Sequence, residues 1–201
     1  MILAHPNAPL GSVTTLRVYD ASDFNIPDAV ILCRNTAPLI EFALALLRRN
    51  VPCHVIGRDI QVGLDKLIDS VGKDITLSQF LLKLQTKEDN EFHRLIRKGK
   101  RQQAESYSDK CSAIRAIAKD AVSVSDIKVA LFRIFADGDG ITLSTIHKAK
   151  GLEWETVFLL DWHLLPSKYA ESADALTQEK NLQYVAVTRA KLHVKFINGD
   201  N

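Results

Sequence analysis

The sequence has few cysteines and no paired ones. Its 201 residues include only Cys33, Cys53 and Cys111, and none of these belongs to a CxxC pair. An odd number of widely spaced cysteines argues against a disulfide framework or a zinc site, and it favours a reducing compartment. Because Cys33 and Cys53 fall within apolar runs, we expect both to be packed rather than reactive. We therefore predict a cytoplasmic protein that holds no metal ion of its own.

Long apolar runs and a strong net charge are also missing. No signal segment and no stretch long enough to cross a membrane is present, so we predict no membrane partner. Lysine and arginine number 26 against 24 aspartates and glutamates, which gives a formal net charge of +2. This balance does not mark a nucleic-acid-binding protein, so any such contact must be local. The 46% hydrophobic content is ordinary for one or two globular domains.

A phosphate-binding loop is the third absence. The pattern GxxxxGK[ST] does not occur, since Gly72-Lys73 and Gly99-Lys100 both lack the upstream glycine and the following hydroxyl. No apolar strand ends in an Asp-Glu pair suited to hold magnesium. We predict that this chain cannot bind and hydrolyse a nucleotide unaided.

Apolar runs that alternate with helical patterns predict an α/β fold with a parallel sheet. Ala29–Cys33 is a continuous apolar run, which is typical of a strand buried on both faces. Asn35 or Thr36 can then cap a helix that extends to about Arg49, and Pro52–Ile56 is the next predicted strand. A strand–helix–strand unit of this length implies a parallel, right-handed crossover.

The middle of the chain changes character. Residues 61–137 are polar and helix-patterned, so we predict a helical insertion within a domain formed by residues 1–60 and 138–201. The expected helices are Gln61–Val71, Leu77–Leu84, Asn90–Arg97, Asp109–Ala121 and Ser125–Phe135. This part also contains the densest basic cluster, His93, Arg94, Arg97, Lys98, Lys100 and Arg101. A solvated helix face explains the cluster more simply than a nucleic-acid contact.

The remaining expected elements lie at the two ends of the chain. They are an edge strand at Thr15–Tyr19, buried strands at Ile141–Ser144 and Thr156–Leu160, a helix at Thr177–Ala190 and a final strand at Lys191–Ile197.

A polar loop between two buried strands is the main candidate site. It contains Thr145, His147, Lys148, Lys150, Gly151 and Glu153. Lysines, an imidazole and a hydroxyl can neutralise and hydrogen-bond phosphate oxygens, and a glycine lets a ligand approach the backbone closely. The glutamate can accept a hydrogen bond from a sugar hydroxyl. A solvated loop is the simpler interpretation of each residue alone, whereas the whole constellation favours a phosphate-containing ligand.

Two arginines extend this candidate site. Arg34 directly follows a buried strand, as does Thr145, and ligands of open α/β sheets bind beyond the carboxyl ends of strands. Arg189 lies on the apolar stripe of its helix, so it either meets an anionic partner or reaches water from the last helical turn. We expect both arginines to converge with the polar loop at one edge of the sheet, where they would suit a phosphoryl group.

Three segments together resemble motifs of superfamily 1 helicases of the UvrD/Rep/PcrA type. Val30–Asn35 resembles motif IV, Thr145–Trp154 resembles motif V and Glu179–Ala190 resembles motif VI, in the family's order. One departure is Lys180-Asn181, where the family usually has two arginines. The resemblance implies the second RecA-like motor domain, a parallel sheet flanked by helices in a P-loop NTPase-like fold without a P-loop. The helical insertion would be an accessory subdomain.

The resemblance also implies partners and roles. ATP with Mg²⁺ would bind between this domain and an N-terminal P-loop motor domain of the same protein, and the chain alone would be inactive. The full protein would be an ATP-dependent DNA helicase acting on single-stranded DNA. Arg34 and Arg189 would contact the γ-phosphate as arginine fingers, Gly151 and Glu153 would bind the nucleotide's sugar, and Thr145, His147 and Lys148 would contact the DNA strand.

Two other classes of function remain open at this point. The missing P-loop leaves open a non-catalytic module, derived from a helicase, that binds nucleic acid or a partner protein. An enzyme that acts alone on a small phosphate compound is disfavoured, because the sequence shows no recognisable base, metal cluster or phosphate loop.

Overall fold

A computed structural model describes residues 10–17 and 19–199 of the chain. Its strands are β1 (Ser12–Thr15), β2 (Ala29–Cys33), β3 (Cys53–Val55), β4 (Ile141–Thr145), β5 (Trp154–Leu160) and β6 (Ala190–Ile197). Its α-helices are α1 (Thr36–Arg48), α2 (Arg58–Val71), α3 (Leu77–Arg97), α4 (Arg101–Ala118), α5 (Val124–Ile134) and α6 (Ala173–Val187). Two short 3₁₀ helices, η1 (Ala21–Phe24) and η2 (Trp162–Leu164), lie in connections.

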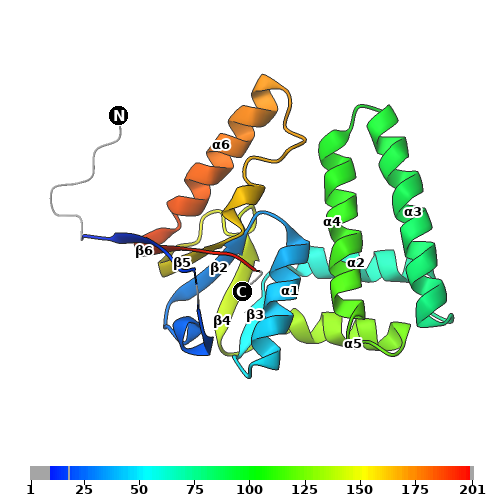
Figure 1. Cartoon of the computed structure of the whole chain (residues 1–201), viewed down its shortest axis with the longest axis horizontal. Helices are drawn as coiled ribbons and strands as arrows, with labels where there is room; N and C mark the ends of the chain where they lie inside the picture. Colours follow the sequence, from blue (N-terminus) through cyan, green and yellow to red (C-terminus); the bar gives the residue numbers. More distant parts are fainter. Residues whose placement is uncertain (1–9, 18, 200–201) are drawn as a thin grey trace.

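All six strands are parallel and form one sheet in the order β1-β6-β5-β2-β4-β3 (Figure 1). Every residue of β2 is buried, as its continuous apolar run predicts. In the register, Cys33 of β2 lies opposite Thr145 of β4 and Leu160 of β5, so these three strands end at the same edge. The predicted α/β architecture, a RecA-like parallel sheet flanked by helices, is confirmed.

The two faces of the sheet carry different helices. Ile31 and Cys33 of β2 join a core cluster that includes residues of α1 to α5, whereas Val30 and Leu32 join a cluster with Leu182 of α6. This division follows from the strand geometry, because successive side chains point to opposite faces. Helix α6 is therefore the cover of the second face, and it returns the chain from β5 to β6.

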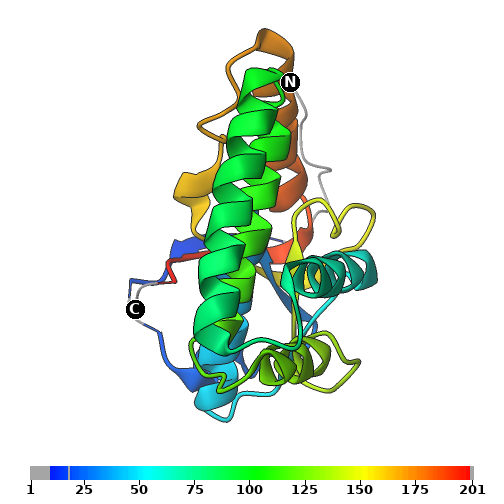
Figure 2. The same ribbon diagram turned by 90° about the vertical axis from the view of Figure 1, so that its right-hand side faces the viewer.

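The helices of the middle segment pack into the same core as the sheet. Helices α3 and α4 form a long antiparallel pair beside the sheet (Figures 1 and 2). Phe80 of α3 and Ile114 of α4 are fully buried in the cluster that also holds Leu39 and Ile40 of α1. The predicted division into a motor domain, 1–60 and 138–201, and an inserted subdomain, 61–137, stays a prediction.

Some predicted boundaries were wrong. Leu77–Leu84 and Asn90–Arg97 are parts of one helix, α3, because the intervening Glu88 is buried and forms an ion pair with Arg115 of α4. Helix α4 begins at Arg101 rather than at Asp109. The expected edge strand at Thr15–Tyr19 instead covers Ser12–Thr15, beside β6, and residue 18 lies outside the described residues.

Candidate functional site

The guanidinium group of Arg34 lies at the carboxyl end of β2 and is held by acidic side chains. Its Nε and Nη2 donate to the two carboxylate oxygens of Glu179 in α6, at 2.9 and 2.8 Å. Its Nη1 donates to Oδ1 of Asn35 at 2.8 Å, and Glu105 of α4 lies 3.2 Å from Nη1 and 3.3 Å from Nη2. All three nitrogens of this guanidinium therefore have a hydrogen-bond partner.

Burial and charge act in opposite directions on this ion pair. The side chains of Arg34 and Glu179 are only 11% and 6% exposed. Burial would lower the pKa of Arg34, but the hydrogen bonds with Glu179 and the charge of Glu105 raise it above its usual value. Burial would raise the pKa of Glu179, but the hydrogen bonds from Arg34 and from the backbone N–H of Ser167 lower it. Both groups are thus charged near neutral pH.

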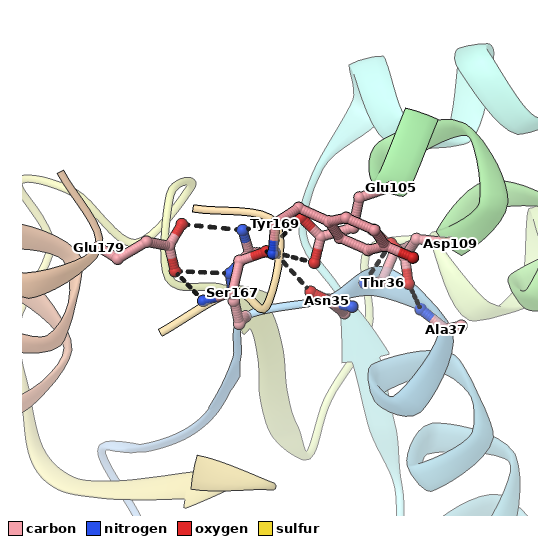
Figure 3. Close-up of polar contacts among 9 residues, drawn as sticks. Asn35, Thr36, Ala37, Glu105, Asp109, Ser167, Tyr169 and Glu179 are labelled. Atoms are coloured by element: carbon pink, nitrogen blue, oxygen red, sulfur yellow. Dashed lines mark hydrogen bonds and ion pairs between the residues drawn. The ribbon is translucent and has the colours of Figure 1, made fainter. Parts of the chain in front are cut away.

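A second carboxylate of α4 caps helix α1. Oδ2 and Oδ1 of Asp109 accept from the backbone N–H groups of Thr36 and Ala37, at 2.7 and 3.0 Å (Figure 3). Asn35 occupies the predicted N-cap position, but its side chain makes no capping bond and accepts from Arg34 instead. Burial raises the pKa of the Asp109 carboxyl, which its two backbone donors partly oppose. The backbone N–H groups at the start of α1 are therefore satisfied by a carboxylate from the middle segment of the chain.

A groove of about 580 Å³ opens above these contacts, between α4 and α6. Its α4 wall includes Gln102 and Glu105, and its α6 wall includes Gln178 and Glu179. Its floor is formed by the residues that follow β2 and by the last residue of β4 with the two after it, which are Arg34, Asn35, Thr36, Thr145, Ile146 and His147. The structure thus brings Arg34, Thr145 and His147 together, as the sequence predicts.

The three residues predicted to contact DNA differ in how accessible they are to a DNA strand. Thr145 is only 5% exposed, and its carbonyl accepts from the N–H groups of Lys148 and Ala149. His147 is exposed, and the partial loss of water around its ring, followed by the charge of Arg34, lowers its pKa. Lys148 lies 2.7 Å from Asp59 in the first turn of α2 and does not line the groove.

Arg189 lies at the amino edge of the sheet. Its carbonyl accepts from the backbone N–H of Trp154, the first residue of β5, at 2.9 Å. Its guanidinium donates to the carbonyl oxygens of Leu152 at 2.9 Å and Val185 at 3.1 Å, and to the hydroxyl of Thr188 at 3.2 Å. Among the residues that the structure describes, no carboxylate lies within ion-pair distance of it, so its charge is not neutralised.

The predicted sugar-binding residues lie beside Arg189. Gly151 and Glu153 flank Leu152, whose carbonyl receives the Arg189 guanidinium, and both are exposed. Gly151 has a φ of +88°, and no atom lies within 4 Å of the position that a Cβ would take. This part of the loop therefore presents open backbone and a free carboxylate next to an arginine.

The predicted convergence of Arg34 and Arg189 at one edge is wrong. Arg34 follows the carboxyl end of β2, whereas Arg189 precedes the amino end of β6. Helix α6 is the crossover between parallel strands, so it returns to the opposite edge and places Arg189 there. The length of helix between Glu179, which holds Arg34, and Arg189 is about 15 Å. The sequence contained this signal, because Arg189 lies just before a predicted strand.

The comparisons with known proteins agree with this architecture. Residues 85–198, more than half of the chain, match the sequence model of the UvrD-like helicase C-terminal domain. The chain belongs to this family. Motifs V and VI of the predicted resemblance lie inside the matched region, whereas the motif IV segment, Val30–Asn35, precedes it.

Several relatives of this UvrD-like domain are named as helicases. The chain is 34% identical over 105 residues to the "Putative ATP-dependent DNA helicase YjcD" of Bacillus subtilis, which covers 45% of this chain and 14% of that protein. It is 39% identical over 61 residues to "ATP-dependent DNA helicase UvrD2" of Mycobacterium tuberculosis, covering 27% of this chain and 9% of that protein. "DNA helicase II" of Rickettsia typhi is 41% identical over 59 residues, covering 27% and 9%. The matched region is thus a small fraction of each relative's length.

Sequence reasoning missed the acidic residues of this UvrD-like domain that hold the groove together. Glu105 and Asp109 lie one turn apart on α4, but the expected helix began only at Asp109. Glu179 stands in the motif VI segment, yet its partner Arg34 is 145 residues away. Spacing along a helix could have paired Glu105 with Asp109, whereas nothing local indicates that Glu105 contacts Arg34 or that Asp109 caps α1. Separately, no helix among the described residues combines the length and apolar character that crossing a membrane requires.

Proposed function

We propose that this UvrD-like domain is the second motor domain of an ATP-dependent DNA helicase, with its nucleotide contacts at the amino edge of the sheet and its DNA contacts in the groove at the carboxyl edge. The observation that carries this proposal is the group of Arg189, Gly151 and Glu153. It combines a cation without a carboxylate partner in the described chain, open backbone and an exposed carboxylate. Such a group is complementary to a nucleoside phosphate.

Arg189 is the proposed arginine finger. ATP with its magnesium ion would be held by the P-loop domain of the same protein, and Arg189 would add positive charge beside the phosphates. The Arg189 guanidinium already rests on three protein oxygens, so its orientation is set before a nucleotide arrives. Glu153 accepts hydrogen bonds from the sugar hydroxyls, next to the unhindered backbone of Gly151.

Arg34 is not part of the proposed nucleotide site. Glu179, Glu105 and Asn35 engage its whole guanidinium, and it lies at the edge of the sheet away from Arg189. Its role as a second arginine finger stays a prediction, and that role requires Arg34 to leave both carboxylates.

The groove between α4 and α6 is the proposed track for single-stranded DNA. His147 and the buried Thr145 lie on its floor, where backbone and imidazole groups can donate to phosphate oxygens. Lys148 lies outside the groove lining, and it would contact the strand by exchanging Asp59 for a phosphate, which costs little because an exposed ion pair is weak. Contacts of this kind carry no base information, so binding tolerates any sequence. A cytoplasmic location stays a prediction.

The test of this proposal uses a protein that joins the chain to its P-loop motor domain. Arg189→Ala should lower ATP hydrolysis about a thousandfold, as the loss of an arginine finger does, and should leave single-stranded DNA binding nearly unchanged. Arg48→Ala is the matched control, because Arg48 is exposed and its ion-pair partner among the described residues is Asp120. Hydrolysis near the normal rate in Arg189→Ala would refute the assignment.

A non-catalytic module that docks on a partner protein is the second candidate. It is favoured by exposed apolar residues around Arg189, namely Leu152 at 45%, Tyr184 at 58% and Val187 at 38% exposure. In the motor proposal the P-loop domain covers this same surface. Binding of the P-loop domain without any gain in ATP hydrolysis would favour the non-catalytic module.

A further inference from the structure

Arg34 connects the two walls of the groove. Its guanidinium binds Glu179 of the α6 wall and Glu105 of the α4 wall at the same time. In Figure 3, Glu179 lies on one side of the network and Glu105 with Asp109 on the other. Because a guanidinium is planar and rigid, one that holds carboxylates from two helices fixes the distance between them.

Ser167 forms a second bridge between the same two carboxylates. Its backbone N–H donates to Glu179 at 2.9 Å, and its hydroxyl donates to Glu105 at 2.7 Å. Ser167 itself is only 4% exposed. Arg34 and Ser167 therefore each bridge Glu105 and Glu179, and both bridges are shielded from solvent.

Asp109 fixes the α4 wall to the floor. It lies one helical turn after Glu105 and accepts from the backbone of Thr36 and Ala37, directly after the β2 end. The α4 wall is thus attached to the β2–α1 junction at two points, through Arg34 and through the first turn of α1. The α6 wall reaches this junction through Glu179.

We propose that Arg34 is a positioning residue that sets the width of the groove for a single-stranded phosphodiester backbone, through Glu105 and Glu179 and without touching a phosphate. The identity of the ligand rests on the proposed function, whereas the width of the groove is a property of the fold. One measurement below tests the width of the groove, and a second tests the binding of single-stranded DNA.

The first measurement needs no nucleic acid. Nitroxide labels on Gln102→Cys and Gln178→Cys, which are exposed on the α4 and α6 walls, report the groove width by pulsed electron resonance. The native thiols react slowly with the label, because burial raises the pKa of Cys33 and Cys111 to about 12 and that of Cys53 to about 11. Arg34→Gln should broaden and lengthen the distance distribution, whereas Arg48→Gln should not. An unchanged distribution in a folded Arg34→Gln chain would overturn the proposal.

The second measurement is binding of a labelled oligothymidylate at several salt concentrations. Arg34→Gln should weaken binding about tenfold with no change in the salt slope, because no phosphate contact is lost. A slope reduced by about one would show direct phosphate contact and contradict the proposal. Where Arg34→Gln does not fold, Arg34→Lys keeps the charge but cannot bridge both walls, so it should weaken binding in the same way.

The two explanations predict opposite changes in DNA affinity for Glu105→Gln. Removing a negative charge beside a DNA track should tighten binding if only charge matters, whereas a widened groove should weaken it. The proposal predicts weaker binding. The matched control is Glu41→Gln, because Glu41 is an exposed partner of Lys119 and does not line the groove, so this change should not alter binding. If the unaltered chain binds no oligothymidylate, the assigned DNA track fails, while the distance measurement still decides the role of Arg34.

Discussion

The two arginines of the motif segments differ in what surrounds them. Arg34 is largely buried and neutralised by Glu179 and Glu105, whereas Arg189 rests on neutral oxygens and keeps its full charge. In the sequence both appear as cations beside a strand. Their partners lie far away along the chain, so only the folded structure separates a structural arginine from one that can bind an anion.

The ion pair of Glu179 makes part of the stability sensitive to acid. Because the folded state lowers its pKa below the usual 4.5, its contribution is present above that pH and is lost as the pH falls through the folded value. The unaltered chain should therefore lose more stability than Glu179→Gln as the pH falls below about 4.5. Urea unfolding at a series of pH values measures the difference between the two chains. Parallel pH profiles would contradict the role given to this carboxylate.

At the scale of elements, local patterns predicted most of the sheet. The run Ala29–Cys33 was confirmed as β2 residue for residue, because a strand buried on both faces must be apolar throughout. The start of α4 was missed, because Arg101–Ser108 is mostly polar and its helical state depends on packing against α3. The spacing of apolar residues predicts which side of a helix is buried. It does not predict a helix that is stabilised by polar contacts such as the ion pair of Glu88 with Arg115.

The connection into β4 depends on a glycine. Gly140 has a φ of +99°, and a Cβ there would lie 1.9 Å from the carbonyl oxygen of Pro52, just before β3. Gly140→Ala should destabilise the chain by more than the 1–3 kcal/mol or so that a strained backbone conformation costs, since β3 must also move. Gly99→Ala is the control, because Gly99 has a φ of +69° and no atom within 4 Å of its Cβ position. Equal losses of unfolding free energy in the two variants would show that the contact with Pro52 is unimportant.

At the scale of the whole molecule, the sheet separates two candidate sites. The groove lies at the carboxyl edge and the Arg189 group at the amino edge, and α6 extends from one to the other. The fold class and the motif segments could be predicted from the sequence. The separation was missed, although Arg34 directly follows one predicted strand and Arg189 directly precedes another, so that in a parallel sheet they lie at opposite edges.

Energy transfer from a bound nucleotide tests this separation most directly. A fluorescent ATP analogue is bound to the two-domain protein, and an acceptor dye is placed either at Glu155→Cys, exposed at the start of β5, or at Gln178→Cys, exposed on the groove wall. The account predicts stronger transfer to the dye at residue 155, because the nucleotide lies beside Arg189. Stronger transfer to the dye at residue 178 would place the nucleotide at the groove and contradict the account.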